Sequence, residues 1–234
     1  MRIAVTRPEE DGEKLVHALR ARGHDTILAP MLKIEMLPPP DIDARNWQAV
    51  IGTSANSFLS LLQHPKRNNL IGLPCACVGP ASAQAAQQLG FRQIYISGGG
   101  LPELTALLAR EFHAGGGPLL YVSGETVSGD LQVPGLEIAR VVTYRAIPAS
   151  HLPDALVAAM RDGTLSGVFL YSPRSAHIWA KLVEQAGLSS EARNVLHYCL
   201  SANVAAALPK GTPVKIAAAP LDAEMLALTE ADAK

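Results

Sequence analysis

Residues 49–58 read AVIGTSANSF, and residues 167–176 read GVFLYSPRSA. Each stretch begins with an apolar run typical of a buried strand, passes through small hydroxyl-bearing residues, and leads into a segment with helical spacing. Aligning the two stretches places Ser54 on Ser172. A strand, a polar turn and a helix that occur twice in this order indicate two copies of one α/β unit.

The similarity continues beyond these stretches, but in a shifted order. CVGPASAQAA at 77–86 follows the first copy, and CLSANVAAAL at 199–208 follows the second at a similar distance. The opening segment, which begins RIAVTRPEEDG, instead resembles residues 118–146 in the middle of the chain. The repeat is therefore permuted, so that one lobe is split in sequence and the other is inserted into it.

We predict an α/β fold of two similar lobes with parallel sheets. Residues 1–32 and 150–234 form the discontinuous lobe, and residues 38–142 form the inserted lobe. Between them, residues 33–37 and 143–149 alternate apolar and polar side chains and lie close to prolines, which predicts two linker strands. Proteins with two lobes and a thin hinge usually move, and they bind ligands in the cleft.

The composition describes a folded protein without a dominant charge. Hydrophobic residues make up 48% and charged residues 18% of the 234 residues, with 20 Lys and Arg against 21 Asp and Glu. No overall field attracts nucleic acid or an anionic membrane, so an acidic ligand must be held by local donors. No apolar run approaches the ~20 residues of a membrane helix, and the N-terminus turns acidic too early for a signal peptide. We expect a cytoplasmic protein without nucleic-acid or membrane partners.

Common cofactor and metal signatures are missing from the sequence. It contains neither G-x-G-x-x-G after a strand nor G-x-x-x-x-G-K-[ST], so we expect no cofactor. Cys75 and Cys77 lie in an apolar run without a His or Cys at ligand spacing, which favours small buried side chains over a metal site. Residues 52–56 come within one residue of G-x-S-x-G, but no Asp–His pair accompanies Ser54, which argues against an acyl hydrolase.

Small polar residues follow most predicted strands, at the sheet edge where α/β proteins bind ligands. In the inserted lobe the candidate binding residues are Thr53, Ser54, Asn56, Gly79, Pro80, Ser82 and Gly124. In the discontinuous lobe they are Thr6, Arg7, Ser172, Pro173, Arg174, Ser175, Ser201 and Asn203. Each hydroxyl or amide is also an ordinary helix cap. Helix starts present N–H groups suited to carboxylate or phosphate, and their recurrence at matching positions favours a ligand.

Tyr144 differs from the other four tyrosines, which fall in or at the ends of predicted core strands. It lies where the chain leaves the inserted lobe. A phenol is neutral at pH 7 and can donate a proton to a departing oxygen, which makes Tyr144 a catalytic candidate. The alternative is an aromatic side chain that packs at the lobe junction.

Taken together, the motifs resemble those of the uroporphyrinogen-III synthase family. The matching stretches cover nearly the whole chain and run, in order, AVTRP, TSANS, CVGPASAQAAQQLGF, LYVSG, VVTYRA, YSPRSA and AAAP. Each is weak alone, but their order and spacing are specific. The resemblance implies two flavodoxin-like lobes joined by a two-stranded linker, with the active site between them.

The resemblance also implies a reaction. The substrate is hydroxymethylbilane, a linear tetrapyrrole with eight carboxylates, and no cofactor is needed. Loss of the hydroxyl from ring A gives an azafulvene, ring D attacks it to form a spiro intermediate, and reclosure leaves ring D inverted. The family's tyrosine falls on Tyr144, which implies assistance to hydroxyl departure.

The family's serine falls on Ser172 or Ser175. Where many members read G-P-T-T-A, residues 201–205 read SANVA, so the role of the threonine passes to Ser201 or Asn203 or is dispensable. Arg7, Arg174 and Lys181 are candidate partners of carboxylates, although Lys181 also fits a solvated helix face. We expect a monomer. The alternative from another class is a non-catalytic two-lobed protein that closes on a small anionic ligand.

Overall fold

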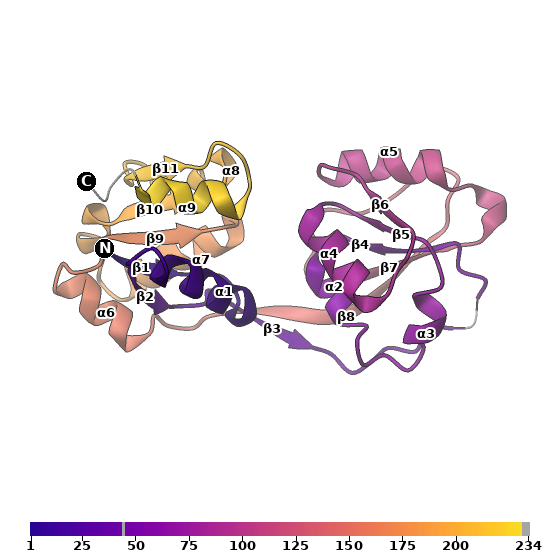
Figure 1. The fold of residues 1–234 in the computed structure, drawn as a ribbon, viewed down its shortest axis with the longest axis horizontal. Coiled ribbons are helices and arrows are strands. Elements are labelled where there is room, and N and C mark those ends of the chain that lie inside the picture. The colour runs from indigo at the N-terminus through magenta and orange to yellow at the C-terminus, as the bar shows by residue number, and fades with distance from the viewer. Residues whose placement is uncertain (44, 231–234) are drawn as a thin grey trace. The chain divides into compact units, whose positions relative to one another are not determined.

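A computed structural model describes residues 1–43 and 45–230 of the chain (Figure 1). The described chain divides into two compact units. Unit 1 combines Met1–Lys33 with the chain from Ile147 onward, and unit 2 comprises Ile34–Ala146.

Unit 1 is built on a five-stranded sheet in the order β11-β10-β9-β1-β2, and its paired strands are parallel. The strands are β1 (Arg2–Val5), β2 (Asp25–Leu28), β9 (Gly167–Leu170), β10 (Leu196–Cys199) and β11 (Val214–Ile216). The helices are α1 (Glu9–Arg20), α6 (Asp154–Arg161), α7 (Pro173–Gln185), η2 (Glu191–Asn194), α8 (Ala202–Ala205) and α9 (Asp222–Glu230).

Unit 2 is built on a six-stranded sheet in the order β3-β8-β7-β4-β5-β6. The strands are β3 (Leu32–Met36), β4 (Ala49–Gly52), β5 (Cys75–Cys77), β6 (Ile94–Ile96), β7 (Leu119–Gly124) and β8 (Ile138–Pro148). The helices are α2 (Ala55–Leu59), α3 (Arg67–Leu70), α4 (Pro80–Leu89), α5 (Leu101–Glu111) and η1 (Ala114–Gly116). The chain passes between the units in β3 and β8, which are neighbours in this sheet.

The strand orders confirm the permuted repeat. Unit 1 runs β2-β1-β9-β10-β11 across its sheet, and unit 2, after its additional edge strand β3, runs β8-β7-β4-β5-β6. The two orders coincide when β7 is matched to β1 and β4 to β9, which is the correspondence that the sequence predicts. The predicted α/β fold with parallel sheets is therefore confirmed. The units differ between the first two matched strands, because α1 joins β1 to β2 whereas residues 125–137 form bends and turns.

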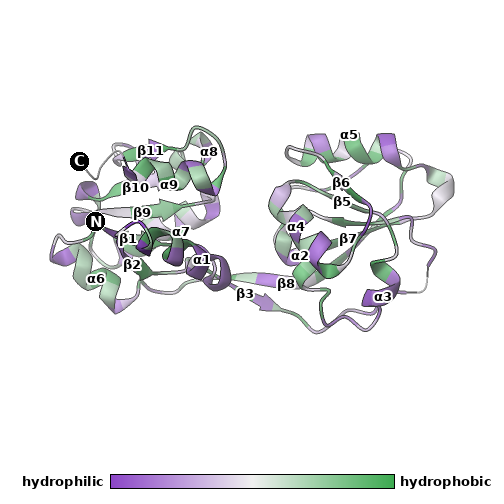
Figure 2. Cartoon of the chain, in the orientation of Figure 1, coloured by the Kyte–Doolittle hydropathy of each residue, from purple (hydrophilic) through white to green (hydrophobic). Residues whose placement is uncertain are grey.

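Alternate residues of the central strands pack on opposite faces of each sheet, as the pleat of a doubly covered sheet requires. In β1, Ala4 packs with α6 and α7, whereas Ile3 and Val5 pack with α1 and α9. In β4, Val50 packs with α2 and α4, and Ile51 packs with α5. Figure 2 shows hydrophobic residues along β4, β7 and β9 and hydrophilic residues on α1 and α3.

The cysteines belong to these cores. Cys75 and Cys77 are buried in the cluster that contains α2 and α4. Burial raises the pKa of Cys75 to about 12 and that of Cys77 to about 11, so both thiols are protonated at neutral pH. They are small hydrophobic side chains, as the sequence indicates. Across the described ranges, no helix is both long and apolar enough to cross a membrane.

Candidate active site

In unit 2, polar groups gather where β4 and β7 end. The Thr53 hydroxyl lies 3.1 Å from the phenol oxygen of Tyr121, which is otherwise buried in the core. The next residue, Ser54, caps α2, because its Oγ accepts a hydrogen bond from the backbone N–H of Asn56 at 3.2 Å. Capping uses a lone pair of Ser54 and leaves its O–H free to donate. Ser54 can therefore cap α2 and donate a hydrogen bond to a ligand at the same time.

Tyr144 lies directly on a glycine of the neighbouring strand. Gly124 of β7 pairs with Tyr144 of β8 just after an irregularity in the register. A Cβ built on Gly124 would approach Tyr144 Cε2 to 2.7 Å, Cζ to 2.9 Å and Oη to 3.2 Å. Glycine is thus needed at this position for the phenol ring to rest on the backbone. The contact fixes one face of the ring.

The hydroxyl of Tyr144 is available to a ligand. Tyr144 is half-buried. Among the residues that the structure describes, none forms a hydrogen bond with its Oη. A fixed ring with an unpartnered hydroxyl suits a group that must meet a reacting atom of a substrate.

Arg140 holds the turn beneath Tyr144. Its Nε donates to Ser123 Oγ at 2.8 Å, and its Nη2 donates to the carbonyl oxygens of Gly124 at 2.8 Å and Glu125 at 2.9 Å. The planar guanidinium therefore fixes three consecutive residues at the end of β7. Sequence reasoning missed Arg140, since an arginine in an alternating strand is indistinguishable from a solvated side chain.

The start of α4 supplies further backbone donors in unit 2. Gly79 is the N-cap of this helix and Pro80 its first residue. The first turn of a helix has N–H groups without partners inside the helix, so it can receive an anion. Ser82, in contrast, is only 6% exposed and packs within α4. Asn56 is half-buried at the start of α2.

In unit 1, the serines after β9 form a cap for α7. Ser172 Oγ accepts from the Ser175 N–H at 3.1 Å and lies 2.9 Å from Ser175 Oγ. Ser175 is 4% exposed, so Ser172 presents the more accessible hydroxyl of the pair. Pro173 begins the helix and is followed by the half-buried Arg174.

Thr6 and Arg7 at the end of β1 make interactions within the protein. The Thr6 hydroxyl donates to the Phe169 carbonyl oxygen at 2.6 Å and is buried, so it ties β1 to β9. Arg7 donates to Asp222 at 3.0 Å and to Asp11 at 2.9 Å, and its guanidinium lies 4.5 Å from the ring centroid of Tyr171. These two carboxylates compete with a substrate carboxylate for the guanidinium of Arg7.

The segment in place of the family's threonine presents two polar side chains. Ser201 precedes α8 and is half-buried, and Asn203 is exposed. Val204 is 1% exposed and belongs to the core of unit 1. Of the residues at this position, only Ser201 and Asn203 therefore remain candidates for a ligand contact.

The fold and the polar residues described above define a class of protein: a two-unit α/β protein with small neutral donors at the carboxyl ends of parallel strands. A sequence model described as uroporphyrinogen-III synthase HemD matches residues 13–228. The chain therefore belongs to the uroporphyrinogen-III synthase family. Membership makes it an enzyme, a cyclising lyase of haem biosynthesis that acts on a small molecule, and decides against a non-catalytic binding protein.

Solved structures of this family are similar to the chain. A mutant uroporphyrinogen III synthase from the extremely thermophilic bacterium Thermus thermophilus is 15% identical, with a TM-score of 0.60 over 99% of this chain and 98% of that one. The wild-type enzyme in another crystal form is also 15% identical, with a TM-score of 0.45 over 99% and 96%. At this identity the first match supports the fold. No curated protein sequence matches the chain.

Proposed function

We propose that this enzyme converts hydroxymethylbilane into uroporphyrinogen III, with loss of water and inversion of ring D. Family membership and the two-unit α/β fold support this assignment. The observation that carries it is Tyr144, whose ring rests on Gly124 and whose hydroxyl has no partner among the described residues. We include in the proposal that the enzyme works as a monomer in the cytoplasm without a cofactor.

Tyr144 acts as a general acid at the first step. Its phenol donates a proton to the hydroxyl of ring A, which leaves as water and gives the azafulvene. The substituted carbon of ring D then attacks to form the spiro intermediate, which fragments and recloses with ring D inverted. Ring closure releases one proton, which restores the phenol. The net change is therefore the loss of one water molecule.

The substrate carboxylates are held by neutral donors and a few cations. The proposed binding residues with accessible groups are Arg7, Thr53, Ser54, Asn56, Gly79, Pro80, Ser172, Pro173, Arg174, Ser201 and Asn203. Gly124, which the sequence also suggests, is buried against the ring of Tyr144. Thr6, Ser82 and Ser175 are less than a tenth exposed, so in the proposed site they position the neighbouring residues and do not contact the substrate. Hydroxyls and helix amides suit the eight carboxylates in a chain whose net charge is only −1.

Isomer selection is the main task of such a site. The free bilane closes unaided without inverting ring D, so the enzyme must hold a curled shape in which ring D meets the azafulvene through its substituted carbon. Orientation of this kind can contribute several kcal/mol to the preferred reaction.

Purified protein tests the proposal with freshly prepared hydroxymethylbilane. The products are oxidised to porphyrins, and their isomers are separated and quantified against a reaction without protein. We expect mainly the type III isomer, formed faster than the bilane disappears in buffer. Type I product alone, at the rate seen in buffer, would overturn the assignment.

A further inference from the structure

A groove of about 590 Å³ runs along one face of α7 in unit 1. One wall is the segment 148–150, at and after the end of β8. The other wall consists of α7 residues spaced three or four apart, which places them on one face of the helix. They are Arg174, His177, Ile178, Lys181, Leu182 and Gln185.

The groove combines a cationic rim with an apolar floor. Arg174, His177 and Lys181 provide N–H groups, and of the described residues that line the groove none is Asp or Glu. This local excess of positive charge contrasts with the net charge of −1 of the whole chain. Beneath it, Leu182 is buried and Ile178 packs against the core of the unit. Such a surface suits a ring that carries anionic arms.

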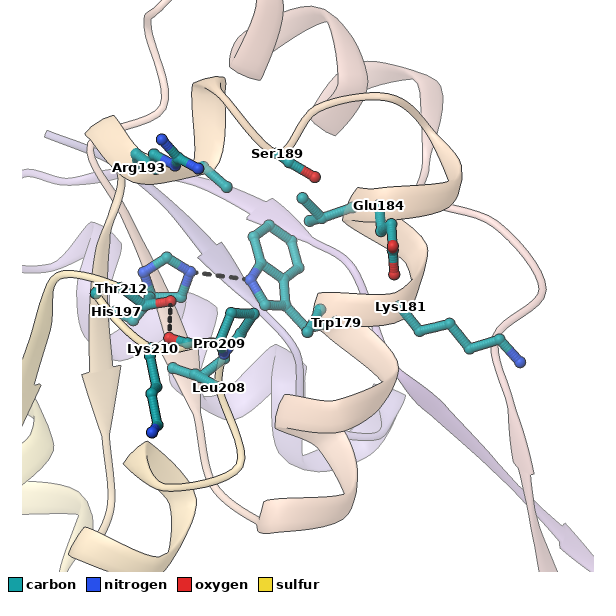
Figure 3. A pocket seen from close by; sticks show the side chains of 14 residues that line it. Trp179, Lys181, Glu184, Ser189, Arg193, His197, Leu208, Pro209, Lys210 and Thr212 are labelled. Carbon is teal, nitrogen blue, oxygen red and sulfur yellow. Dashed lines mark hydrogen bonds between the residues drawn. The ribbon is translucent and has the colours of Figure 1, made fainter.

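A larger hollow of about 730 Å³ lies on another side of α7 (Figure 3), and its lining contains Glu184 as well as the cations Lys181, Arg193 and Lys210. Its floor contains Trp179 and His197, each 1% exposed, and Trp179 Nε1 donates to His197 Nε2 at 3.0 Å. The remaining ring nitrogen of His197 lies 3.2 Å from the Pro213 carbonyl oxygen. The polar atoms of this floor are thus already partnered. Figure 3 shows the ammonium of Lys181 pointing away from Trp179 and His197.

We infer that the groove beside α7 binds one pyrrole ring of the substrate through its two carboxylate arms. Lys181 and Arg174 pair with the carboxylates, His177 donates a hydrogen bond, and the ring rests over Ile178. The inference rests on the proposed function and extends the proposed donors from Arg174, at the start of α7, along one face of the helix. A volume of 590 Å³ is within the range of small-molecule sites and accommodates one substituted ring.

Lys181 variants test the subsite by kinetics. Lys181 is exposed, so K181Q and K181E should fold and melt like the wild type. Exposed ion pairs are individually weak, so we expect the KM for hydroxymethylbilane to rise about threefold in K181Q and about tenfold in K181E, with kcat within about twofold. Lys210 is an exposed lysine that lines the larger hollow and not the groove. The matched controls K210Q and K210E should leave KM unchanged.

A binding measurement separates this inference from the proposed function. Mellitate, a benzene ring with six carboxylates, is titrated into the wild-type protein while the imidazole proton signals of His177 and His113 are followed by NMR. We expect a saturable shift of the His177 signal that K181E abolishes, and no shift of the exposed His113 in unit 2.

The outcomes differ for the two claims. If the wild type makes the type III isomer but KM is unchanged in K181E, or rises equally in K210E, the groove inference fails and the function stands. If the wild type makes only the type I isomer, the proposed function fails, and the mellitate titration alone decides whether the groove is an anion site. Absence of a His177 shift would then also overturn the inference that the groove binds carboxylates.

Discussion

Replacing Gly124 by alanine should displace Tyr144 while leaving the fold intact. A Cβ on Gly124 would lie 2.7 Å from Tyr144 Cε2, against the 3.4 Å at which ordinary contact begins, so the ring must move by about 0.7 Å or more. The backbone of Gly124 does not have a positive φ, so alanine is not strained there. The ring is the end of a rotatable side chain and moves more readily than β7.

The displacement sets the size of the effect. Misplacement of a catalytic group by about 1 Å can lower the rate by about 100-fold, and mild overpacking costs about 1–3 kcal/mol of stability. We expect G124A to lower kcat for hydroxymethylbilane by about 10- to 100-fold and the free energy of unfolding by about 1 kcal/mol. Initial rates of type III isomer formation and urea unfolding measure the two quantities.

A matched variant and a double-mutant cycle control this prediction. G72A also adds a Cβ in unit 2, but its nearest neighbour, the Asn69 carbonyl oxygen, lies at an ordinary 3.5 Å, so kcat should not change. If G124A acts through Tyr144, it should reduce activity little further in a Y144F background. Wild-type kcat in G124A, or full additivity of its loss with that of Y144F, would refute the reasoning.

Two further predictions concern His197 and Arg140. Burial lowers the pKa of His197 from 6.5 to about 4, so between these values the unfolded chain binds a proton that the folded chain does not. Stability should therefore fall as the pH drops from 6.5 towards 4, by about 2 kcal/mol at pH 5 in urea unfolding. R140K keeps the charge but reaches fewer of the three acceptors, so kcat should fall about tenfold with KM unchanged, measured by initial rates.

Each of these predictions has its own control. In H197Q, which cannot titrate, the loss of stability between pH 7.5 and pH 5 should shrink by about 2 kcal/mol, and an undiminished loss would assign it to other groups. Arg145 forms an exposed pair with Glu35 at 2.8 Å, so R145K is the matched change at a position that holds no turn. Equal effects of R140K and R145K on kcat would contradict a positioning role for Arg140.

The sheet topology was predictable because the strands are apolar segments whose order along the chain can be matched between the two units. Matching AVIG at 49–52 to GVFL at 167–170, and the opening segment to residues 118–146, reproduces the strand order of both sheets. Parallel strands buried on both faces need continuous apolar runs, and such runs survive permutation of the chain. Family membership was predictable from the sequence for a related reason, because the family's motifs lie at the ends of these strands.

The roles of individual polar residues were less predictable, because burial depends on packing between distant segments. Thr6 and Ser175 match the pattern of exposed donors, yet both are buried, and Thr6 is held by Phe169 from a strand more than 160 residues away. Arg140 and the groove beside α7 carry no local motif. The contacts of Arg140 form because β7 pairs with β8. The groove forms because the end of β8 lies beside α7.

The turnover of a Tyr144→Phe variant tests the central claim most directly, because this change removes only the hydroxyl. General acids typically contribute about 100- to 10,000-fold, so kcat for hydroxymethylbilane should fall at least 100-fold while the melting temperature stays within about 2 °C. Tyr95→Phe, which removes a hydroxyl that already has a partner in Gln93, should retain full activity. A kcat within about twofold of the wild type in Tyr144→Phe would contradict the account.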